Sequence, residues 1–131
     1  MKSLVVEDEF TSRVLLHYVL SGYGECHIAV NGEEAVDAFH AALANGAPYN
    51  LISMDIRMPE MDGNEAIRRI RAIETEGHLL STPAVKILLV TAVENPEEAE
   101  QLPHARSDAR IGKPIEATKL LQELRKLALI P

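Results

Sequence analysis

Short apolar runs alternate with longer amphipathic stretches along the whole chain. The runs are rich in β-branched residues and end at polar or turn-forming residues, which is the pattern of β-strands. They lie at residues 4–6, 26–30, 51–54, 86–91 and, more weakly, 109–111. Several of them lack the polar alternation of a half-exposed strand, as expected for parallel strands that are covered on both faces.

Stretches of helical length separate these runs, with apolar residues spaced three or four positions apart. We expect helices over residues 10–20, 33–44, 64–74 and 116–129, and a short one over 95–102. Pro103 must end the short helix, and Asn31-Gly32 is a turn that can cap the second one. The first helix has its apolar positions at Val14, Leu15, Tyr18 and Val19. The third places its isoleucines on one face and Arg68, Arg69 and Arg71 on the other.

This alternation of strand and helix predicts an α/β fold, with an open, doubly wound parallel sheet of five strands and five helices on its two faces. In such folds, ligands bind outside the carboxyl ends of the strands, where the strand order reverses. The residues that end each strand should therefore converge, and the chemistry of the chain is to be sought there.

The composition bears on the number of domains, the partners and the cellular compartment. A chain of 131 residues fits one domain, residues 1–131, and the net charge of −7 argues against binding nucleic acid or an anionic membrane surface. Cys26 is the single cysteine, so no disulfide can form within the chain, and its ordinary role is that of a small buried hydrophobe. The amino-terminal apolar run is too short for a signal peptide, and no stretch approaches the roughly 20 apolar residues of a membrane span. We expect a cytoplasmic protein.

Charged and polar residues end four of the five predicted strands. They are Glu7-Asp8-Glu9, Asp55, Thr91-Ala92 and Gly112-Lys113-Pro114. Two carboxylates about 4 Å apart repel by roughly 4 kcal/mol at an effective dielectric constant near 20, so such a cluster needs a proton, a cation or a basic side chain. Taken singly, each group has an ordinary explanation as a solvated loop, a turn cap or a surface lysine. Together they suit Mg²⁺ and phosphoryl transfer, since a carboxylate can itself be the nucleophile.

The same segments resemble the receiver domain of bacterial response regulators. The resemblance rests on Leu4-Val5-Val6-Glu7-Asp8-Glu9, Met54-Asp55-Ile56-Arg57-Met58-Pro59-Glu60-Met61-Asp62-Gly63, Val90-Thr91-Ala92 and Gly112-Lys113-Pro114, in order and spacing. It covers essentially the whole chain and implies a flavodoxin-like sheet with strand order 2-1-3-4-5, as in the chemotaxis regulators. Because only the last predicted helix follows Lys113, we expect a stand-alone receiver with no output domain.

The resemblance assigns a role to each acidic residue of the cluster. Asp55 corresponds to the aspartate that takes a phosphoryl group from a phosphohistidine. Asp8 corresponds to a direct ligand of Mg²⁺ (or Mn²⁺), Glu7 to a ligand acting through water, and Asp55 and the backbone carbonyl of Arg57 complete the metal site. The implied donor is a sensor histidine kinase or a histidine phosphotransfer protein. Such a domain is not an enzyme on other molecules, and catalyses only its own phosphorylation and dephosphorylation.

The remaining strand-end residues are assigned to the switch by the same resemblance. Thr91 corresponds to the hydroxyl that moves to the phosphoryl group, Lys113 to the lysine that pairs with the acids and then with phosphate, and Ala92 to the small residue that leaves room for it. The Lys113–Pro114 peptide corresponds to one that is cis in the family. Arg110 departs from the pattern, because the family carries an aromatic residue there. We expect Arg110 to pair with an acid such as Glu94 or Glu98, or the switch to work without burying an aromatic ring.

Three functions remain as alternatives. The first is a phosphorylation-controlled module that binds an unknown downstream protein through residues 95–102, the fifth strand and the last helix, as a monomer or a weak phosphorylation-dependent dimer. The second is a phosphotransfer intermediate between two histidine proteins. The third, a Mg²⁺-dependent phosphohydrolase, is disfavoured because Arg57 stands where such enzymes carry a second acid.

Overall fold

The structure, a computed structural model, describes residues 1–58, 61, 63–76, 84–91 and 107–131. Within them lies a five-stranded sheet in the order β2-β1-β3-β4-β5, and every neighbouring pair of strands is parallel. The strands are β1 (Ser3–Val6), β2 (Cys26–Ala29), β3 (Leu51–Asp55), β4 (Lys86–Thr91) and β5 (Ala109–Gly112). The predicted fold class and strand order are confirmed, and β3 runs one residue further than predicted, so that Asp55 belongs to the strand.

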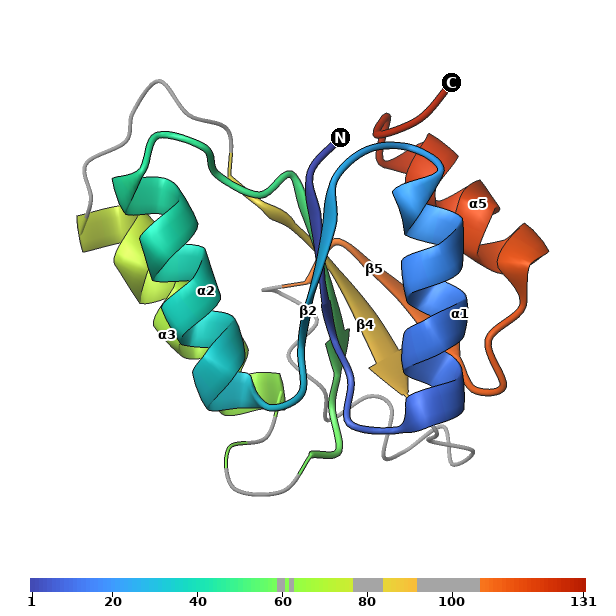
Figure 1. Cartoon of the computed structure of the whole chain (residues 1–131), viewed down its shortest axis with the longest axis horizontal. Helices are drawn as coiled ribbons and strands as arrows, with labels where there is room; N and C mark the ends of the chain where they lie inside the picture. Colours follow the sequence, from blue (N-terminus) through green and yellow to red (C-terminus); the bar gives the residue numbers. More distant parts are fainter. Residues whose placement is uncertain (59–60, 62, 77–83, 92–106) are drawn as a thin grey trace.

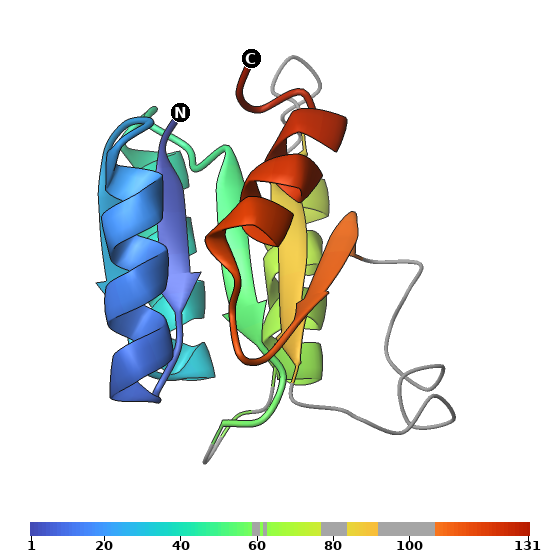
Figure 2. The same ribbon diagram turned by 90° about the vertical axis from the view of Figure 1, so that its right-hand side faces the viewer.

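Helices cover both faces of this sheet. They are α1 (Phe10–Ser21), α2 (Gly32–Ala44), α3 (Gly63–Glu76) and α5 (Ala117–Lys126). Figure 1 shows α2 and α3 on one side of the sheet and α1 and α5 on the other, and Figure 2 shows α1 and α5 side by side on their face. The helix expected over residues 95–102 lies outside the described residues. Among the helices that are described, none has the length and apolar character that a membrane span requires.

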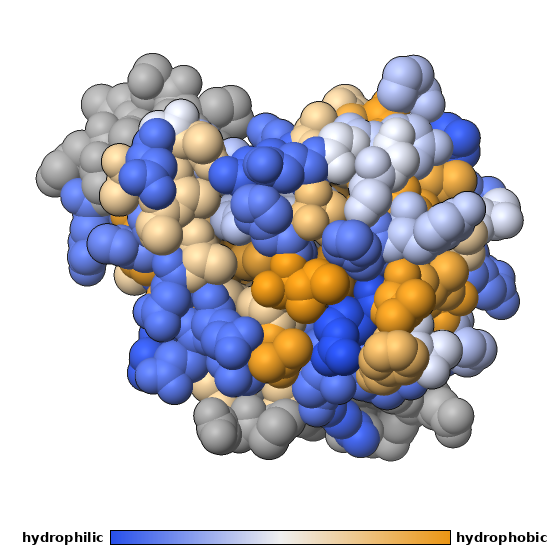
Figure 3. All heavy atoms as spheres, in the orientation of Figure 1, coloured by the Kyte–Doolittle hydropathy of each residue, from blue (hydrophilic) through white to orange (hydrophobic). Residues whose placement is uncertain are grey.

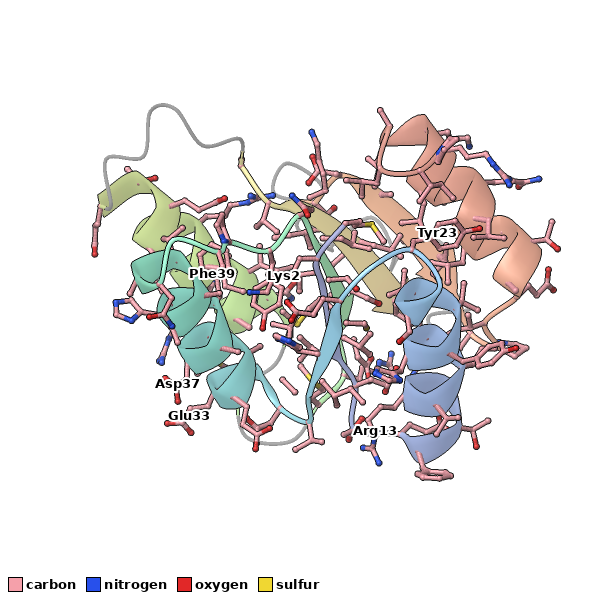
Figure 4. The ribbon with its side chains drawn as sticks, turned by 45° about the horizontal axis from the view of Figure 1, so that its top comes forward. Lys2, Arg13, Tyr23, Glu33, Asp37 and Phe39 are labelled. Atoms are coloured by element: carbon pink, nitrogen blue, oxygen red, sulfur yellow. The ribbon has the colours of Figure 1, made fainter. Side chains whose placement is uncertain are left out.

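Two apolar cores form because successive strand residues point to opposite faces. One core joins alternate residues of β1, β3 and β4 to α2 and α3, and the other joins the intervening residues to α1 and α5. Phe39 is buried in the first, whereas Glu33 and Asp37 point away from α2 into solvent (Figure 4). The predicted cap of α2 is also present, since Asn31 Oδ1 accepts a hydrogen bond from the Glu34 N–H at 2.8 Å.

The buried face of α1 differs from the apolar positions that the sequence emphasised. Leu16 and Leu20 are fully buried, whereas Val14 is 49% and Tyr18 79% exposed. Seven of the residues from Phe10 to Leu20 are apolar and they surround most of the helix, so their spacing alone did not identify the side that packs on the sheet.

Arg71 likewise does not remain on the solvent face with the other arginines of α3. Its guanidinium donates to Glu74 Oε1 at 2.8 Å, to the Val85 carbonyl at 2.8 Å and to Asp108 Oδ2 at 3.2 Å. Asp108 Oδ2 also accepts from the Ile87 N–H at 2.9 Å. This network joins the end of α3 to the starts of β4 and β5. It lies at the amino-terminal ends of the strands, whereas the acidic cluster lies at their carboxyl ends.

The last helix ends at Lys126, three residues before the predicted end at Leu129. The Leu129 N–H donates to the Leu124 carbonyl at 3.0 Å, and the Ala128 N–H donates to the Arg125 carbonyl at 3.0 Å. These two bonds form a Schellman motif, which requires a residue in the left-handed region after the helix. Ala128 fills that position with φ of 59°, although glycine adopts this conformation without steric cost. The apolar spacing continued through this turn and hid the end of the helix.

We therefore predict that Ala128→Gly stabilises the protein. Removing the Cβ relieves a conformation that costs an L-residue about 1 kcal/mol, which should raise the midpoint of thermal unfolding by about 3–6 °C. Calorimetry of both proteins measures the shift. Ala128→Val is the control, because a β-branched side chain aggravates the same strain. If the valine variant is as stable as the glycine variant, the assigned helix end is wrong.

Candidate metal and phosphoacceptor site

Three strand ends bring two carboxylates and an ammonium group together. Glu7 directly follows β1, Asp55 ends β3 and Lys113 directly follows β5. Lys113 Nζ lies 3.0 Å from Glu7 Oε1 and 3.4 Å from Asp55 Oδ2. Glu7 is fully buried and Asp55 is 3% exposed, so the lysine compensates two acids that water barely reaches.

Backbone groups hold both carboxylates in place. Glu7 Oε2 accepts from the Glu9 N–H at 3.1 Å, and Asp55 Oδ1 accepts from the Arg57 N–H at 3.1 Å. The Arg13 guanidinium reaches back from α1 to the Glu7 carbonyl at 3.5 Å. The segment that follows each strand thus fixes the acid that ends it.

Gly63 allows the loop after Asp55 to close tightly. The Ile56 N–H donates to the Val90 carbonyl at 3.2 Å, and the Gly63 N–H donates to the Ile56 carbonyl at 3.0 Å. A Cβ on Gly63 would lie 2.7 Å from the Asp55 carbonyl oxygen and 2.9 Å from Ile56 Cα, both of them backbone atoms. Only glycine can start α3 this close to the end of β3.

The environment of Asp55 favours its protonated form when no cation is present. Burial, followed by the hydrogen bond and the charge of Glu7, raises the pKa of Asp55 to about 7, although Lys113 and the Arg57 N–H act in the opposite direction. Burial lowers the pKa of Lys113, but the combined effect of Glu7 and Asp55 outweighs it, and that pKa is raised. The lysine therefore stays charged at neutral pH, whereas Asp55 is partly protonated there.

The donor set fits a hard divalent cation. Glu7, Asp8 and Asp55 each offer one carboxylate oxygen, and these atoms lie within 4.8 Å of one another. Asp8 is exposed, which leaves one side of the group open to water and to a phosphate oxygen. Glu7 Oε1 is buried and makes no hydrogen bond of regular geometry, although the Lys113 ammonium is 3.0 Å away. Unsatisfied carboxylate oxygen beside an open position is what Mg²⁺ or Mn²⁺ requires.

The other predicted residues take the following places. Thr91 is buried at the end of β4, and its carbonyl accepts from the Lys113 N–H at 2.9 Å. The Lys113–Pro114 peptide is cis, and the Arg57 side chain is exposed. Arg110 is partly buried in β5, opposite Leu89 of β4. Ala92 and the acids proposed to pair with Arg110, Glu94 and Glu98, lie outside the described residues.

Sequence reasoning missed the residues that support Glu7. Glu9 caps α1, because its side-chain Oε2 accepts from the Ser12 N–H at 2.6 Å, and its own N–H holds Glu7. An acid three positions before a serine at a helix start was the available signal, but the preferred capping residues are Ser, Thr, Asp and Asn. Arg13 gave no signal, since its contact spans the turn between β1 and α1.

A doubly wound parallel sheet with buried acids and a lysine at its carboxyl edge defines the class of phosphoacceptor signalling domains. Residues 3–125 match the response regulator receiver domain, and the chain belongs to that family. This family comprises signalling domains of two-component phosphorelay systems.

Individual relatives agree with this assignment. Two-component response regulator ORR41 from Oryza sativa subsp. japonica is 36% identical over 98% of this chain and 95% of that protein. Two-component response regulator 24 from Arabidopsis thaliana is 33% identical over 97% of this chain and 84% of that protein. The receiver domain of the histidine kinase CKI1 from Arabidopsis thaliana, solved with Mg²⁺ and BeF₃⁻, has a TM-score of 0.79 and 29% identity, over 98% of this chain and 90% of that one.

The pKa of Asp55 predicts how stability changes with pH in the absence of divalent cations. A free aspartate has a pKa of 3.8, so between about pH 4 and 7 the folded protein holds a proton that the unfolded chain has lost. The free energy of unfolding should therefore fall as the pH rises through 7, by about 1–3 kcal/mol between pH 5.5 and 8.

Urea unfolding in EDTA across this range measures the effect. Asp55→Asn is the control, because it cannot titrate, and the difference between the two proteins removes the contribution of the histidines. MgCl₂ should stabilise the wild type more at pH 8 than at pH 5.5, since the cation displaces the proton. Parallel profiles of the two proteins in EDTA would contradict the raised pKa.

Proposed function

We propose that this receiver domain accepts a phosphoryl group on Asp55 from a phosphohistidine of a sensor kinase or a histidine phosphotransfer protein. The observation that supports it most is the placement of Asp55, a carboxylate 3% exposed with Lys113 at 3.4 Å and a candidate cation site around it. Histidine kinases are phosphorylated with ATP, which is available in the cytoplasm. A reducing compartment also suits the lone Cys26, so we place the reaction in the cytoplasm.

The transfer forms one bond and breaks another. An oxygen of the ionised Asp55 carboxylate attacks the phosphorus, the P–N bond of the phosphohistidine breaks, and its electron pair returns to the imidazole, which takes up a proton. The product is an acyl phosphate on Asp55. The Arg57 N–H, which donates to Asp55 Oδ1 at 3.1 Å, orients the carboxylate so that its other oxygen can react.

Charge compensation is the main catalytic requirement, because the transferring group carries negative charge on its equatorial oxygens. Glu7, Asp8, Asp55 and the Arg57 carbonyl would hold Mg²⁺ or Mn²⁺, which supplies positive charge to those oxygens when bound. Lys113, whose Nζ lies 3.4 Å from Asp55 Oδ2, would supply a second positive charge. The domain thereby catalyses only its own phosphorylation and, with water as the attacking group, its dephosphorylation.

The phosphorylated domain would signal through the segment after Thr91 and the elements beyond it. Thr91 ends the strand next to Asp55 and can donate its hydroxyl to the phosphoryl group, while Lys113 exchanges Glu7 for a phosphoryl oxygen. The downstream partner would then contact β5 and α5, and the predicted partner surface also includes residues 95–102, which lie outside the described residues. Arg110 lies on β5 in that region and takes the place of an aromatic residue in the switch.

Intact-mass analysis tests phosphorylation directly. Incubated with MgCl₂ and phosphoramidate, the wild type should gain the mass of one phosphoryl group, because the small donor needs only the site itself. Asp55→Asn should gain none, and EDTA should abolish the gain. Equal modification of the asparagine variant would place the acceptor elsewhere, and an unmodified wild type would refute the proposal.

The donor protein must cover the surface next to the site, and α1 offers an apolar one. Phe10, Val14 and Tyr18 are exposed at successive turns of α1, starting two residues after Asp8. Figure 3 shows apolar surface over α1 and again over neighbouring β2, with hydrophilic surface between them. Contiguous apolar surface on a protein commonly marks a site where another protein binds. We assign it to a helix of the histidine phosphodonor.

Val14→Glu should separate the two kinds of donor. A charge in the middle of the stripe opposes burial by a protein, so transfer from a phosphorylated histidine kinase or phosphotransfer protein should slow at least tenfold, as for an interface hot spot. The rate with phosphoramidate should not change, because Val14 does not touch the site. Equal slowing with both donors would indicate a damaged fold, and an unchanged rate with the protein donor would refute the assignment.

A further inference from the structure

Glu9 is connected to the cation site through its backbone and to α1 through its side chain. Its N–H donates to Glu7 Oε2 at 3.1 Å, and its Oε2 accepts from the Ser12 N–H at 2.6 Å. Glu9 itself is exposed and is not among the acids that could ligate a cation. We infer that Glu9 is a positioning residue for the cation site: its cap on α1 fixes the peptide N–H that holds Glu7. This inference rests on the cation site of the proposed function.

The cap determines the direction of that N–H. At Glu9 the backbone is extended, with φ of −85° and ψ of 125°, whereas the helix begins at the next residue. The side-chain bond to Ser12 keeps the chain in this conformation, because it ties the residue before the helix to its first turn. If the cap is lost, the first turn can fray and the N–H of Glu9 is free to rotate away from Glu7.

Glu7 depends on this N–H more than an exposed acid would. Its other oxygen, Oε1, has no regular hydrogen bond among the described residues, and Lys113 is shared with Asp55. The Glu9 N–H and the lysine are therefore the donors that orient the Glu7 carboxylate toward Asp55. Groups that orient a ligand without touching the metal commonly change its affinity by an order of magnitude or more.

Two substitutions separate the cap from the charge. Glu9→Ser and Glu9→Ala both remove a negative charge near the cation, but serine is a good capping residue and alanine is a poor one. Any difference between them is due to the cap. Asn31→Ala is the matched control, because it removes the cap of α2, where Asn31 accepts from the Glu34 N–H, without touching Glu7.

Isothermal titration calorimetry with MgCl₂ and with MnCl₂ measures the dissociation constants, and urea unfolding shows that each variant is folded. We expect Glu9→Ala to bind either cation about tenfold more weakly than Glu9→Ser, and Asn31→Ala to bind like the wild type. Equal affinities of the serine and alanine variants would overturn the inference, as would a loss in Asn31→Ala as large as that in Glu9→Ala. If the wild type binds neither cation, the cation site of the proposed function fails as well. Cation binding without phosphorylation by phosphoramidate would refute only the proposed phosphoacceptor role.

Discussion

The rest of the structure depends on the burial of Glu7 and Asp55 around one lysine. Two carboxylates removed from water repel each other and lose their hydration, and a single ammonium group compensates only part of this cost. The acids follow β1 and β3, which are adjacent, whereas Lys113 follows β5 at the edge of the sheet. The five parallel strands must therefore end at the same edge, in this order, for the three side chains to meet. The incomplete compensation makes Glu7, Asp8 and Asp55 a candidate cation site.

The local features around the site serve the same constraint. Gly63 starts α3 where a Cβ would clash with the backbone of Asp55 and Ile56. The Arg57 N–H donates to the Asp55 carboxylate, and the Glu9 N–H donates to Glu7. None of these bonds contributes much to the stability of an already packed domain. Each one restricts the position of an acid that would otherwise turn toward water. At the amino-terminal ends of β4 and β5, Arg71 is hydrogen-bonded to Glu74 and Asp108. There the acids and the arginine compensate one another, and this network does not need a cation.

The sequence alone allowed the fold and the positions of Glu7 and Asp55 to be predicted. It did not allow the hydrogen bonds that orient these two carboxylates to be predicted. The strands were predictable because continuous apolar runs have few alternatives, and Asp55, Glu7 and Lys113 were predictable because they end such runs. The buried face of α1 was not, since apolar residues surround that helix and only packing selects Leu16 and Leu20. The true end of α5 was hidden for a related reason: its apolar spacing continues into a turn that a left-handed alanine makes. The hydrogen bonds of Arg71 to Val85 and Asp108 link groups whose proximity only the folded chain creates. Glu9 was missed for a different reason, because glutamate is not among the preferred capping residues.

Lys113 connects Asp55, which ends β3, to β5, the strand at the edge of the sheet. The phosphoryl group proposed for Asp55 would bring new acceptor oxygens within reach of the lysine, which would then exchange Glu7 for one of them. Lys113 is bonded through its backbone N–H to the Thr91 carbonyl and follows β5 directly, so a shift of its side chain would act on the ends of β4 and β5 together. Arg110 lies three residues before it on β5. An arginine there cannot enter an apolar pocket unpaired, because the desolvation of its charge is too costly. If Arg110 takes part in the proposed switch, its guanidinium would therefore exchange one charge partner for another and would not enter an apolar pocket.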